Sequence, residues 1–285
     1  MSIPSTPFDP SLNPRSDFVT SADGARIGYL SLGSGSSVIV VPGALSTASD
    51  YLDFARCLAA EFTVHIIERR GRGVSDPQGD EYGLDKERDD VLAVQRETGA
   101  ALLVGHSFGG LIALESARAS GIFEKVAVYE PGVSIDGSIP MGWLASYATH
   151  LNAGKDLDAF VAFSRGTGPD RARRLPHQLM KWLIPLFVSS ERREKMYTLL
   201  PQNMLEHRAI GRAEENWRTY DHIVAPVLLM SGGKTGTSWV EETIRRLGQV
   251  LPHSERTVFD GLDHFGIDQG NPAEVAQVVR RFLRS

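Results

Sequence analysis

The chain has 285 residues, of which 42% are hydrophobic and 23% are charged, and its formal net charge is −5. This length and composition allow one substantial hydrophobic core, alone or with an inserted lid. The mild charge, with no Lys/Arg run and no membrane-spanning apolar run, argues against a nucleic-acid or membrane partner. The single cysteine, Cys57, excludes an internal disulfide and fits a reducing, cytoplasmic setting.

The N-terminal half of the sequence predicts strands and helices in alternation. Residues 1–18 are rich in Pro and Ser and have no apolar segment, so we expect a partly ordered arm, neither a signal peptide nor an anchor. Beyond it, β-branched runs predict strands, and apolar residues at helical spacing predict helices. The expected elements are a hairpin over residues 18–30, strands over 37–41, 63–67 and 101–104, and helices over 49–60 and 84–97.

The C-terminal half predicts a helical segment inserted into the same alternation. Strands are expected over residues 125–129, 226–230 and 257–259, and helices over 240–251 and 273–283. Between Pro131 and Asp221 strand signals vanish, and Met, Trp, Phe and Leu recur at helical spacing. An all-helical insertion is therefore expected there, with most of its apolar residues in packing seams and one face looking onto the site. Truncating the seam residues Phe163 or Trp182 is expected to alter the preference for acyl-chain length.

The order of the elements predicts the fold class and the domain limits. Strands that alternate with helices are typical of an α/β protein with a mostly parallel sheet covered on both faces, here with a hairpin at its N-terminal edge. We divide the chain into residues 1–131 as the first part of the core, 132–221 as a helical cap, and 222–285 as the second part of the core.

The segment around Ser107 carries the clearest chemical signal. Apolar residues 101–104 predict a buried strand, Gly-His-Ser-Phe-Gly follows at 105–109, and a helical pattern continues from Leu111. Gly-x-Ser-x-Gly between a strand and a helix is the nucleophile elbow, in which a strained turn exposes the serine and glycines let strand and helix approach. A glycine-rich turn after any parallel strand would give the same five residues, so the context has to decide.

Taken in order, five segments resemble the α/β-hydrolase superfamily over nearly the whole chain. They are Val41-Pro42-Gly43-Ala44, Arg70-Gly71-Arg72-Gly73-Val74-Ser75, the Ser107 elbow, the helical cap, and Gly261-Leu262-Asp263-His264-Phe265. The resemblance implies an α/β-hydrolase fold: an eight-stranded, mostly parallel sheet with helices on both faces and an inserted helical cap. It also implies ligand binding between core and cap, at the carboxyl ends of the strands.

His264 is the candidate base among the eight histidines. Ser107 needs a base to take its proton during attack, and neutral imidazole serves near physiological pH. His264 follows the last expected strand in a Gly-x-x-His-Phe context, which resembles the family's catalytic position. We expect His106 to point away from the nucleophile, His65 to be buried or cross-strand, and the others to lie on the surface or in the cap.

Two backbone amides are the candidate donors of an oxyanion hole. The resemblance assigns them to Phe108, which follows the nucleophile, and to Ala44, in the loop after the third strand. The family usually has His-Gly in that loop, whereas this chain has Pro42-Gly43. Pro42 removes one amide and stiffens the turn, but it leaves the Ala44 amide free, so we expect the hole to survive.

Glu130 is the candidate third member of the triad. The family commonly places an aspartate after the seventh strand, but residues 230–236 contain no carboxylate. The sixth strand ends with Tyr129-Glu130-Pro131, where some members of the superfamily carry the acid, and this tripeptide resembles that of one bacterial set. A role in hydrogen-bonding loop amides at the start of the cap stays open for Glu130. Asp263 would have to fold back on its neighbour, and Glu68, on the far side of the nucleophile, is expected to pair with a neighbouring arginine.

The leading hypothesis is a serine hydrolase that cleaves a small, mostly apolar carboxylic ester, thioester or lactone through an acyl-enzyme. Ser107 attacks, His264 carries the proton, and Glu130 orients the imidazole. The same residues would serve carbon–carbon bond hydrolysis, acyl transfer or perhydrolysis, and a non-catalytic ligand receptor or scaffold is the alternative from another class. No sequence motif indicates a metal or other cofactor, so a small-molecule substrate is the expected partner, and a homodimer stays open.

Overall fold

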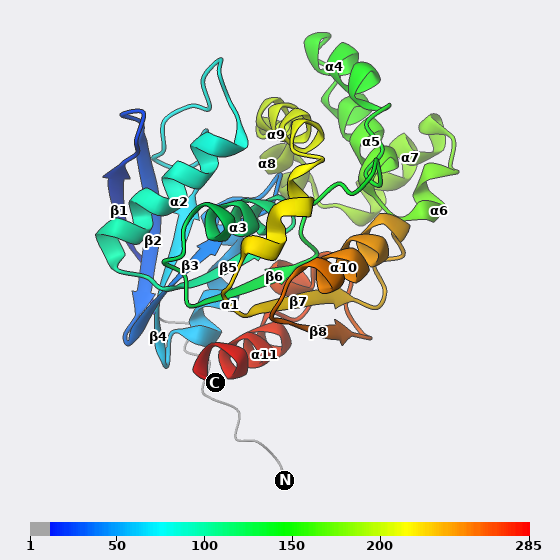
Figure 1. The fold of residues 1–285 in the computed structure, drawn as a ribbon. Helices are drawn as coiled ribbons and strands as arrows, with labels where there is room; N and C mark the ends of the chain where they lie inside the picture. The colour runs from blue at the N-terminus through cyan, green and yellow to red at the C-terminus, as the bar shows by residue number, and fades with distance from the viewer. Residues whose placement is uncertain (1–11) are drawn as a thin grey trace.

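An eight-stranded sheet forms the centre of the protein (Figure 1). The computed structural model describes residues 12–285, so most of the expected N-terminal arm lies outside the described residues. The strands are β1 (Arg15–Thr20), β2 (Arg26–Gly33), β3 (Ser36–Val41), β4 (Phe62–Glu68), β5 (Leu102–His106), β6 (Lys125–Tyr129), β7 (Val227–Gly232) and β8 (Ser254–Phe259). Their order is β1-β2-β4-β3-β5-β6-β7-β8. β2 is antiparallel to both β1 and β4, and all other neighbours in this sheet are parallel.

Two hydrophobic layers cover the two faces of the sheet. Along β3, Ile39 and Val41 belong to one layer and Val38 and Val40 to the other, which is the period of two of a strand buried on both faces. The first layer is completed by α2 (Leu84–Thr98), α3 (Phe108–Ala119) and α10 (Ser238–Val250). The second is completed by α1 (Leu52–Leu58) and α11 (Pro272–Arg284) (Figure 1). The mostly parallel α/β architecture expected from the sequence is confirmed.

The edge strands are longer than the sequence indicated. Residues 15–17, expected in the arm, belong to β1, and residues 254–256 extend β8 before the expected start at Thr257. Most side chains of both strands are exposed or half-buried. Pairing at a sheet edge needs only backbone hydrogen bonds, so an edge strand can carry polar side chains such as Glu255 and Arg256. Such a strand is not an apolar run, and apolar patterning does not predict it.

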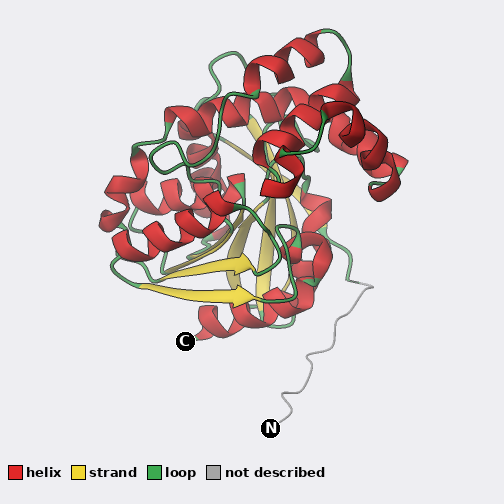
Figure 2. Cartoon of the chain, turned by 90° about the vertical axis from the view of Figure 1, so that its right-hand side faces the viewer, coloured by secondary structure: helices red, strands yellow, loops and turns green. Residues whose placement is uncertain are grey.

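The segment between β6 and β7 is helical. Its elements are α4 (Leu144–Asn152), α5 (Asp156–Thr167), α6 (Asp170–Arg173), α7 (His177–Phe187), α8 (Ser190–Thr198), α9 (Leu200–Arg212) and η2 (Asn216–His222). Figure 2 shows helices of this segment gathered on the side of the sheet opposite the C-terminus. Tyr147, Phe160 and Leu200 belong to a separate hydrophobic cluster inside it, whereas Ile135 and Trp217, near its two ends, join the core.

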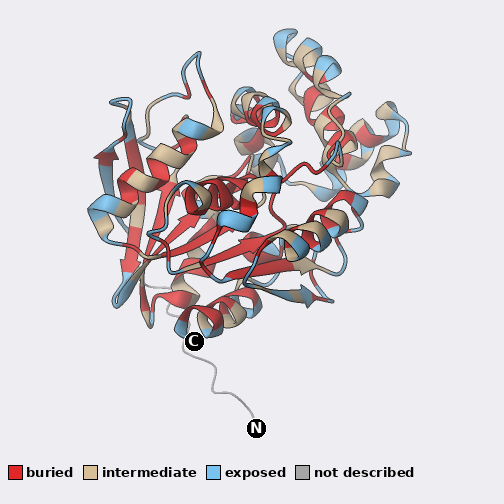
Figure 3. Ribbon diagram, viewed as in Figure 1, coloured by how far each residue is buried: buried red, intermediate tan, exposed pale blue. Residues whose placement is uncertain are grey.

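One expectation for this helical segment is wrong. Trp182 is 67% exposed rather than packed in a seam, and Leu186 and Phe187 on the same helix are also exposed. Helix α7 carries apolar residues on several sides, of which Met180 and Ile184 are buried, so spacing alone could not tell which side packs. Figure 3 shows burial concentrated in the central strands and α3, with exposed stretches on the helices between β6 and β7. Within residues 12–285, every helix is too short or too polar to cross a bilayer.

Candidate active site

Ser107 occupies the sharp turn between β5 and α3. Its φ of 52° and ψ of −121° are strained for a residue with a side chain. The flanking glycines allow the close approach that the elbow motif predicts. A Cβ on Gly105 would lie 2.4 Å from the carbonyl oxygen of Gly109, and a Cβ on Gly109 would lie 2.1 Å from that of Val41. Strand β5 and helix α3 therefore pack too closely at this turn to admit a side chain at Gly105 or Gly109, and Ser107 lies between them.

Ser107, His264 and Glu130 form one continuous hydrogen-bonded chain, although they follow three different strands. His264 Nε2 lies 3.1 Å from Ser107 Oγ, and His264 Nδ1 lies 2.7 Å from Glu130 Oε2. An ionised carboxylate only accepts hydrogen bonds, so Nδ1 carries the proton and the lone pair of Nε2 faces the serine hydroxyl. This is the tautomer that a general base requires.

Glu130 is fully buried and is held by the loop that follows β7. Its φ is 43°, and its backbone amide donates to the carbonyl of Met230 at 2.9 Å. Oε1 accepts hydrogen bonds from the amide of Gly232, at 2.8 Å, and from the hydroxyl of Thr235. One carboxylate oxygen therefore contacts the imidazole, and the other contacts the end of β7 and the loop after it, rather than loop amides at the start of the helical segment. The contact of Thr235 was not expected from the sequence, where its only signal is a hydroxyl in a loop without a carboxylate.

The charge of Glu130 controls the protonation of His264. Burial lowers the pKa of His264, but the hydrogen bond and charge of Glu130 outweigh it, so the pKa lies above its ordinary value. Asp268 and Asp263 act in the same direction. Asp268 is itself buried, which raises its pKa to about 6. Among residues 12–285, no three or more His, Cys, Asp or Glu side chains are grouped so that they could hold a metal ion.

The other two candidate acids face elsewhere. Asp263 is exposed, and its Oδ1 accepts the amide of Phe265 at 2.9 Å. Glu68 accepts the amide of Val74 at 2.9 Å. The expected pairing of Glu68 with an arginine is wrong: within residues 12–285 Glu68 forms no ion pair, and the arginines that follow it, Arg69, Arg70 and Arg72, pair with other carboxylates.

His106 connects the loop after β3 to the backbone of His264 through hydrogen bonds. The amide of Gly43 donates to the hydroxyl of Tyr51 at 2.9 Å, and that hydroxyl lies 2.6 Å from His106 Nδ1. Since the tyrosine has one proton, it donates to Nδ1, and His106 Nε2–H donates to the carbonyl of His264 at 2.9 Å. Burial holds the pKa of His106 well below its ordinary value, so the ring stays neutral. As expected, His106 does not serve Ser107. Nothing in the sequence singled out Tyr51.

The candidate oxyanion donors, Ala44 and Phe108, belong to two segments that lie next to Ser107. Phe108 is the first residue of α3, where a helical amide has no partner within the helix. Ala44 lies in the loop after β3, and a Cβ on neighbouring Gly43 would come within 3.2 Å of Ser107 Cβ. The loop with Ala44 therefore passes directly against Ser107. His65 is buried between Ser31 and Ser37, as expected for a cross-strand residue.

Comparisons with known proteins agree with this architecture. The chain is 33% identical to the N-formylmaleamate deformylase of Pseudomonas putida over 155 residues, which are 50% of this chain and 58% of the deformylase. The match thus spans less than two thirds of that relative. It is 22% identical to the 2-(acetamidomethylene)succinate hydrolase of Mesorhizobium japonicum over 265 residues, 88% of this chain and 89% of that hydrolase.

The fold comparison and the family comparison extend over more of the chain. The crystal structure of an alpha/beta hydrolase from Sphaerobacter thermophilus superposes with a TM-score of 0.79 at 26% identity, covering 94% of this chain and 100% of that one. The model of the alpha/beta hydrolase family matches residues 38–278. Because this match covers well over half of the sequence, the chain belongs to the alpha/beta hydrolase family and is an enzyme, a hydrolase.

Proposed function

We propose that this hydrolase cleaves a small, mostly apolar carboxylic ester, thioester or lactone through an acyl-enzyme. The observation that carries the proposal is the hydrogen-bonded chain from Ser107 through His264 to the buried Glu130. In the first half-reaction, Ser107 Oγ attacks the acyl carbon and its proton passes to His264 Nε2. Glu130 stabilises the imidazolium, and the leaving oxygen or sulfur takes the proton from Nε2.

The amides of Ala44 and Phe108 are the proposed donors to the oxyanion of each tetrahedral intermediate. In the second half-reaction, a water molecule gives its proton to His264 Nε2 and attacks the acyl carbon. The ester bond to Ser107 breaks, the serine oxygen regains the proton, and the free acid leaves. No group other than water is consumed.

A second candidate is hydrolysis of a carbon–nitrogen bond in a formyl- or acyl-amide. The deformylase and the acetamidomethylene-succinate hydrolase, both similar to this chain, support it by their names. The same residues would act, with His264 protonating the leaving nitrogen. Carbon–carbon bond hydrolysis, acyl transfer and perhydrolysis use the same triad, whereas the hydrolase family argues against a non-catalytic receptor.

We further propose that the enzyme acts in the cytoplasm on a free small molecule, without a nucleic-acid or membrane partner. The mild net charge of −5 and the single cysteine support this setting. Cys57 lies half-buried on α1, and burial raises the pKa of its thiol, as expected of a structural cysteine.

The decisive test is Ser107→Ala, assayed with nitrophenyl esters of graded acyl length, several lactones and N-formyl amides. We expect turnover and labelling by a fluorophosphonate probe to disappear, while the melting temperature stays close to that of the parent. Turnover within tenfold of the parent on the best substrate would reject Ser107 as the nucleophile. The order of the three substrate classes decides between the ester and amide candidates.

A further inference from the structure

We propose that Arg69 is a positioning residue of the oxyanion hole. Its guanidinium holds the peptide between Gly43 and Ala44, so that the Ala44 amide faces the reacting carbonyl, and Glu206 of the cap holds Arg69 in place. The inference rests on the proposed function, because it concerns an oxyanion that forms only during acyl transfer.

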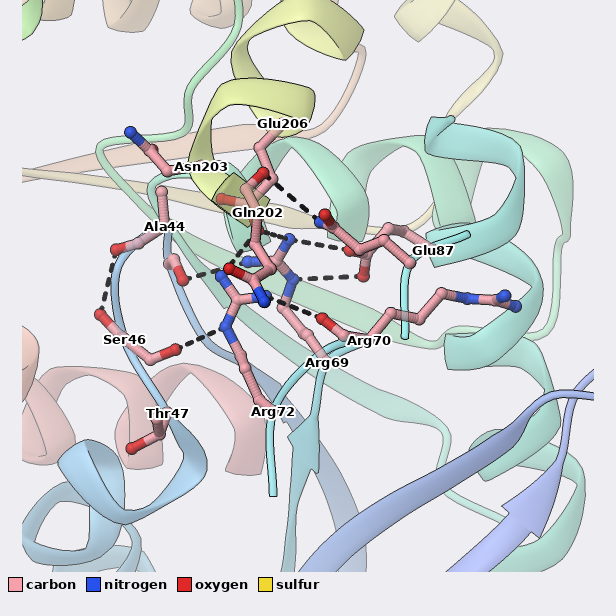
Figure 4. Close-up of polar contacts among 12 residues, drawn as sticks. Ala44, Ser46, Thr47, Arg69, Arg70, Arg72, Glu87, Gln202, Asn203 and Glu206 are labelled. Carbon is pink, nitrogen blue, oxygen red and sulfur yellow. Dashed lines mark hydrogen bonds and ion pairs between the residues drawn. The ribbon is translucent and has the colours of Figure 1, made fainter. Parts of the chain in front are cut away.

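Arg69 lies in a buried polar cluster directly against the loop that follows β3 (Figure 4). Its side chain is 0% exposed. Nη1 donates to the carbonyl oxygen of Gly43 at 3.1 Å, while Nη2 reaches Glu87 at 2.8 Å and Glu206 at 2.7 Å. Nε donates to the other oxygen of Glu87 at 3.2 Å. The two carboxylates thus fix the orientation of the planar guanidinium, and its remaining nitrogen, Nη1, binds the carbonyl of Gly43.

The contact with Gly43 determines where the Ala44 amide points. The carbonyl of Gly43 and the N–H of Ala44 belong to one trans peptide unit, in which the two groups point in opposite directions. With the oxygen held toward the buried cluster, the N–H is turned away from it. A cation bound to the carbonyl also draws electron density from the amide, which strengthens its N–H as a hydrogen-bond donor.

The same guanidinium contacts the residue that carries the second proposed donor. The central carbon of the Arg69 guanidinium lies 4.6 Å from the ring centroid of Phe108, a cation–π contact. Phe108 is fully buried, so this contact helps to place the first turn of α3 relative to the loop. One side chain therefore touches both halves of the proposed oxyanion hole.

Glu206 extends this support into the cap. It is fully buried on α9, and its Oε1 accepts hydrogen bonds from Arg69 at 2.7 Å and from Arg72 at 2.6 Å. Arg72 Nε in turn donates to the carbonyl of Ser46 at 2.8 Å. Burial raises the pKa of Glu206, but the two guanidinium groups outweigh it and hold the pKa below its ordinary value. One cap carboxylate thus anchors the loop at two of its carbonyls, Gly43 and Ser46.

Arg70 provides a matched comparison. Its side chain is also buried, at 3% exposure, and it is paired with Asp90 at 2.7 Å and Asp23 at 2.8 Å. Those carboxylates belong to α2 and to the turn between β1 and β2, and neither belongs to the loop after β3. A purely structural role predicts similar effects for Arg69 and Arg70, whereas a positioning role predicts a kinetic defect at Arg69 alone.

The experiment compares Arg69→Lys with Arg70→Lys. Lysine keeps the charge beside the carboxylates, but one ammonium nitrogen cannot replace the fork that also reaches Gly43. Both variants should lose similar thermal stability. For the best nitrophenyl ester, Arg69→Lys should lower kcat by about 10²-fold, with KM within about threefold of the parent. Arg70→Lys should leave kcat within about threefold of the parent.

A trifluoromethyl ketone analogue of that ester separates positioning from general damage. The ketone adds to Ser107 and forms a stable oxyanion, so its Ki should rise by the same factor by which kcat/KM falls in Arg69→Lys. Glu206→Gln, which removes the charge but not the shape, should raise Ki and lower kcat in parallel by about tenfold. If Arg69→Lys does not fold, Glu206→Gln takes its place in the comparison with Arg70→Lys.

Equal kinetic losses in the two arginine variants, or an unchanged Ki in both Arg69→Lys and Glu206→Gln, would overturn the inference. The proposed function is judged separately by Ser107→Ala in the same assay. If Ser107→Ala is inactive and Arg69→Lys is not impaired, only the positioning role fails. If Ser107→Ala keeps its turnover, the acyl-enzyme proposal fails, and the positioning role fails with it.

Discussion

The hydroxyl of Thr235 donates a hydrogen bond to Oε1 of Glu130, a residue 105 positions earlier in the chain. Thr235 lies in the loop after β7, where the family resemblance leads one to expect the acid. In this protein the loop solvates the carboxylate instead of supplying it, and Glu130 reaches the loop from the adjacent strand, β6.

Glu130→Gln should cripple catalysis and shift its pH dependence. An imidazole without its carboxylate loses the compensation of its transition-state charge, so kcat should fall by about 10⁴ with a smaller change in KM. His264 must be neutral to accept a proton, and Glu130 raises the pKa of His264. Without that charge the pKa falls, so the acid limb of the kcat/KM profile should move to lower pH.

Asp263→Asn is the control for this prediction. Asp263 binds the amide of Phe265 rather than the imidazole, so its loss should cost far less activity. If Asp263→Asn is the crippling change and Glu130→Gln is mild, Asp263 is the acid.

Thr235→Val should destabilise the protein by leaving Oε1 of Glu130 with the Gly232 amide as its remaining donor. Hydrogen bonds to charged groups contribute about 1.5–3 kcal/mol, and the free energy of unfolding at pH 7 should fall by that amount. Chemical denaturation provides the measurement. Thr235→Ser keeps the hydroxyl and should stay near the parent. A loss in Thr235→Ser with none in Thr235→Val would mean that the methyl group, and not the hydroxyl, is what the site requires.

Gly109→Ala should damage both stability and activity, because the new Cβ would lie 2.1 Å from the carbonyl oxygen of Val41. Forcing such a contact typically costs about 1–3 kcal/mol, and the displaced loop includes Ala44. Gly142→Ala adds its Cβ in open space and serves as the control. Melting curves and ester turnover should separate the two variants. Identical curves would show that the elbow tolerates a side chain at Gly109.

The two cap aromatics should differ in their effect on stability. Phe163 packs against Trp143 and His207, with ring centroids 5.7 and 5.4 Å apart, so Phe163→Ala should lower the free energy of unfolding by about 1–3 kcal/mol. Trp182 is largely exposed, so Trp182→Ala should stay within about 0.5 kcal/mol of the parent. We also expect Phe163→Ala to change the ratio of kcat/KM for short and long acyl chains. A larger effect at Trp182 on both readouts would contradict this assignment.

The parts of the fold that the sequence predicted well are those with a local signature. Parallel strands buried on both faces are continuous apolar runs, and the elbow needs glycine at fixed positions beside Ser107. The positions of Glu130 and His264, each directly after a predicted strand, could be taken from the order of the elements. Their catalytic roles and the domain limits at residues 131 and 221 stay predictions.

The missed residues act through contacts between distant segments. Tyr51 reaches His106 across 55 residues and Arg69 reaches Glu206 across 137 residues, and no pattern along the chain marks either pair. A buried arginine looks like a surface arginine in the sequence, because its burial depends on carboxylates that other elements supply. The prediction of which side of α7 is buried was wrong for a similar reason, since tertiary packing decides which of its apolar faces is covered.

The place of β8 in the sheet has a consequence for how the enzyme loses activity on heating. β8 is an edge strand, and His264 follows it, whereas β5 and β6, which precede Ser107 and Glu130, have partners on both sides. Edge segments open at lower free energy than central strands. Amide hydrogen exchange should therefore reach residues 260–266 well before residues 102–106. The enzyme would then lose the proposed base, His264, while the proposed nucleophile, Ser107, is still in place. Brief heating should therefore inactivate it reversibly, as long as the central strands stay closed.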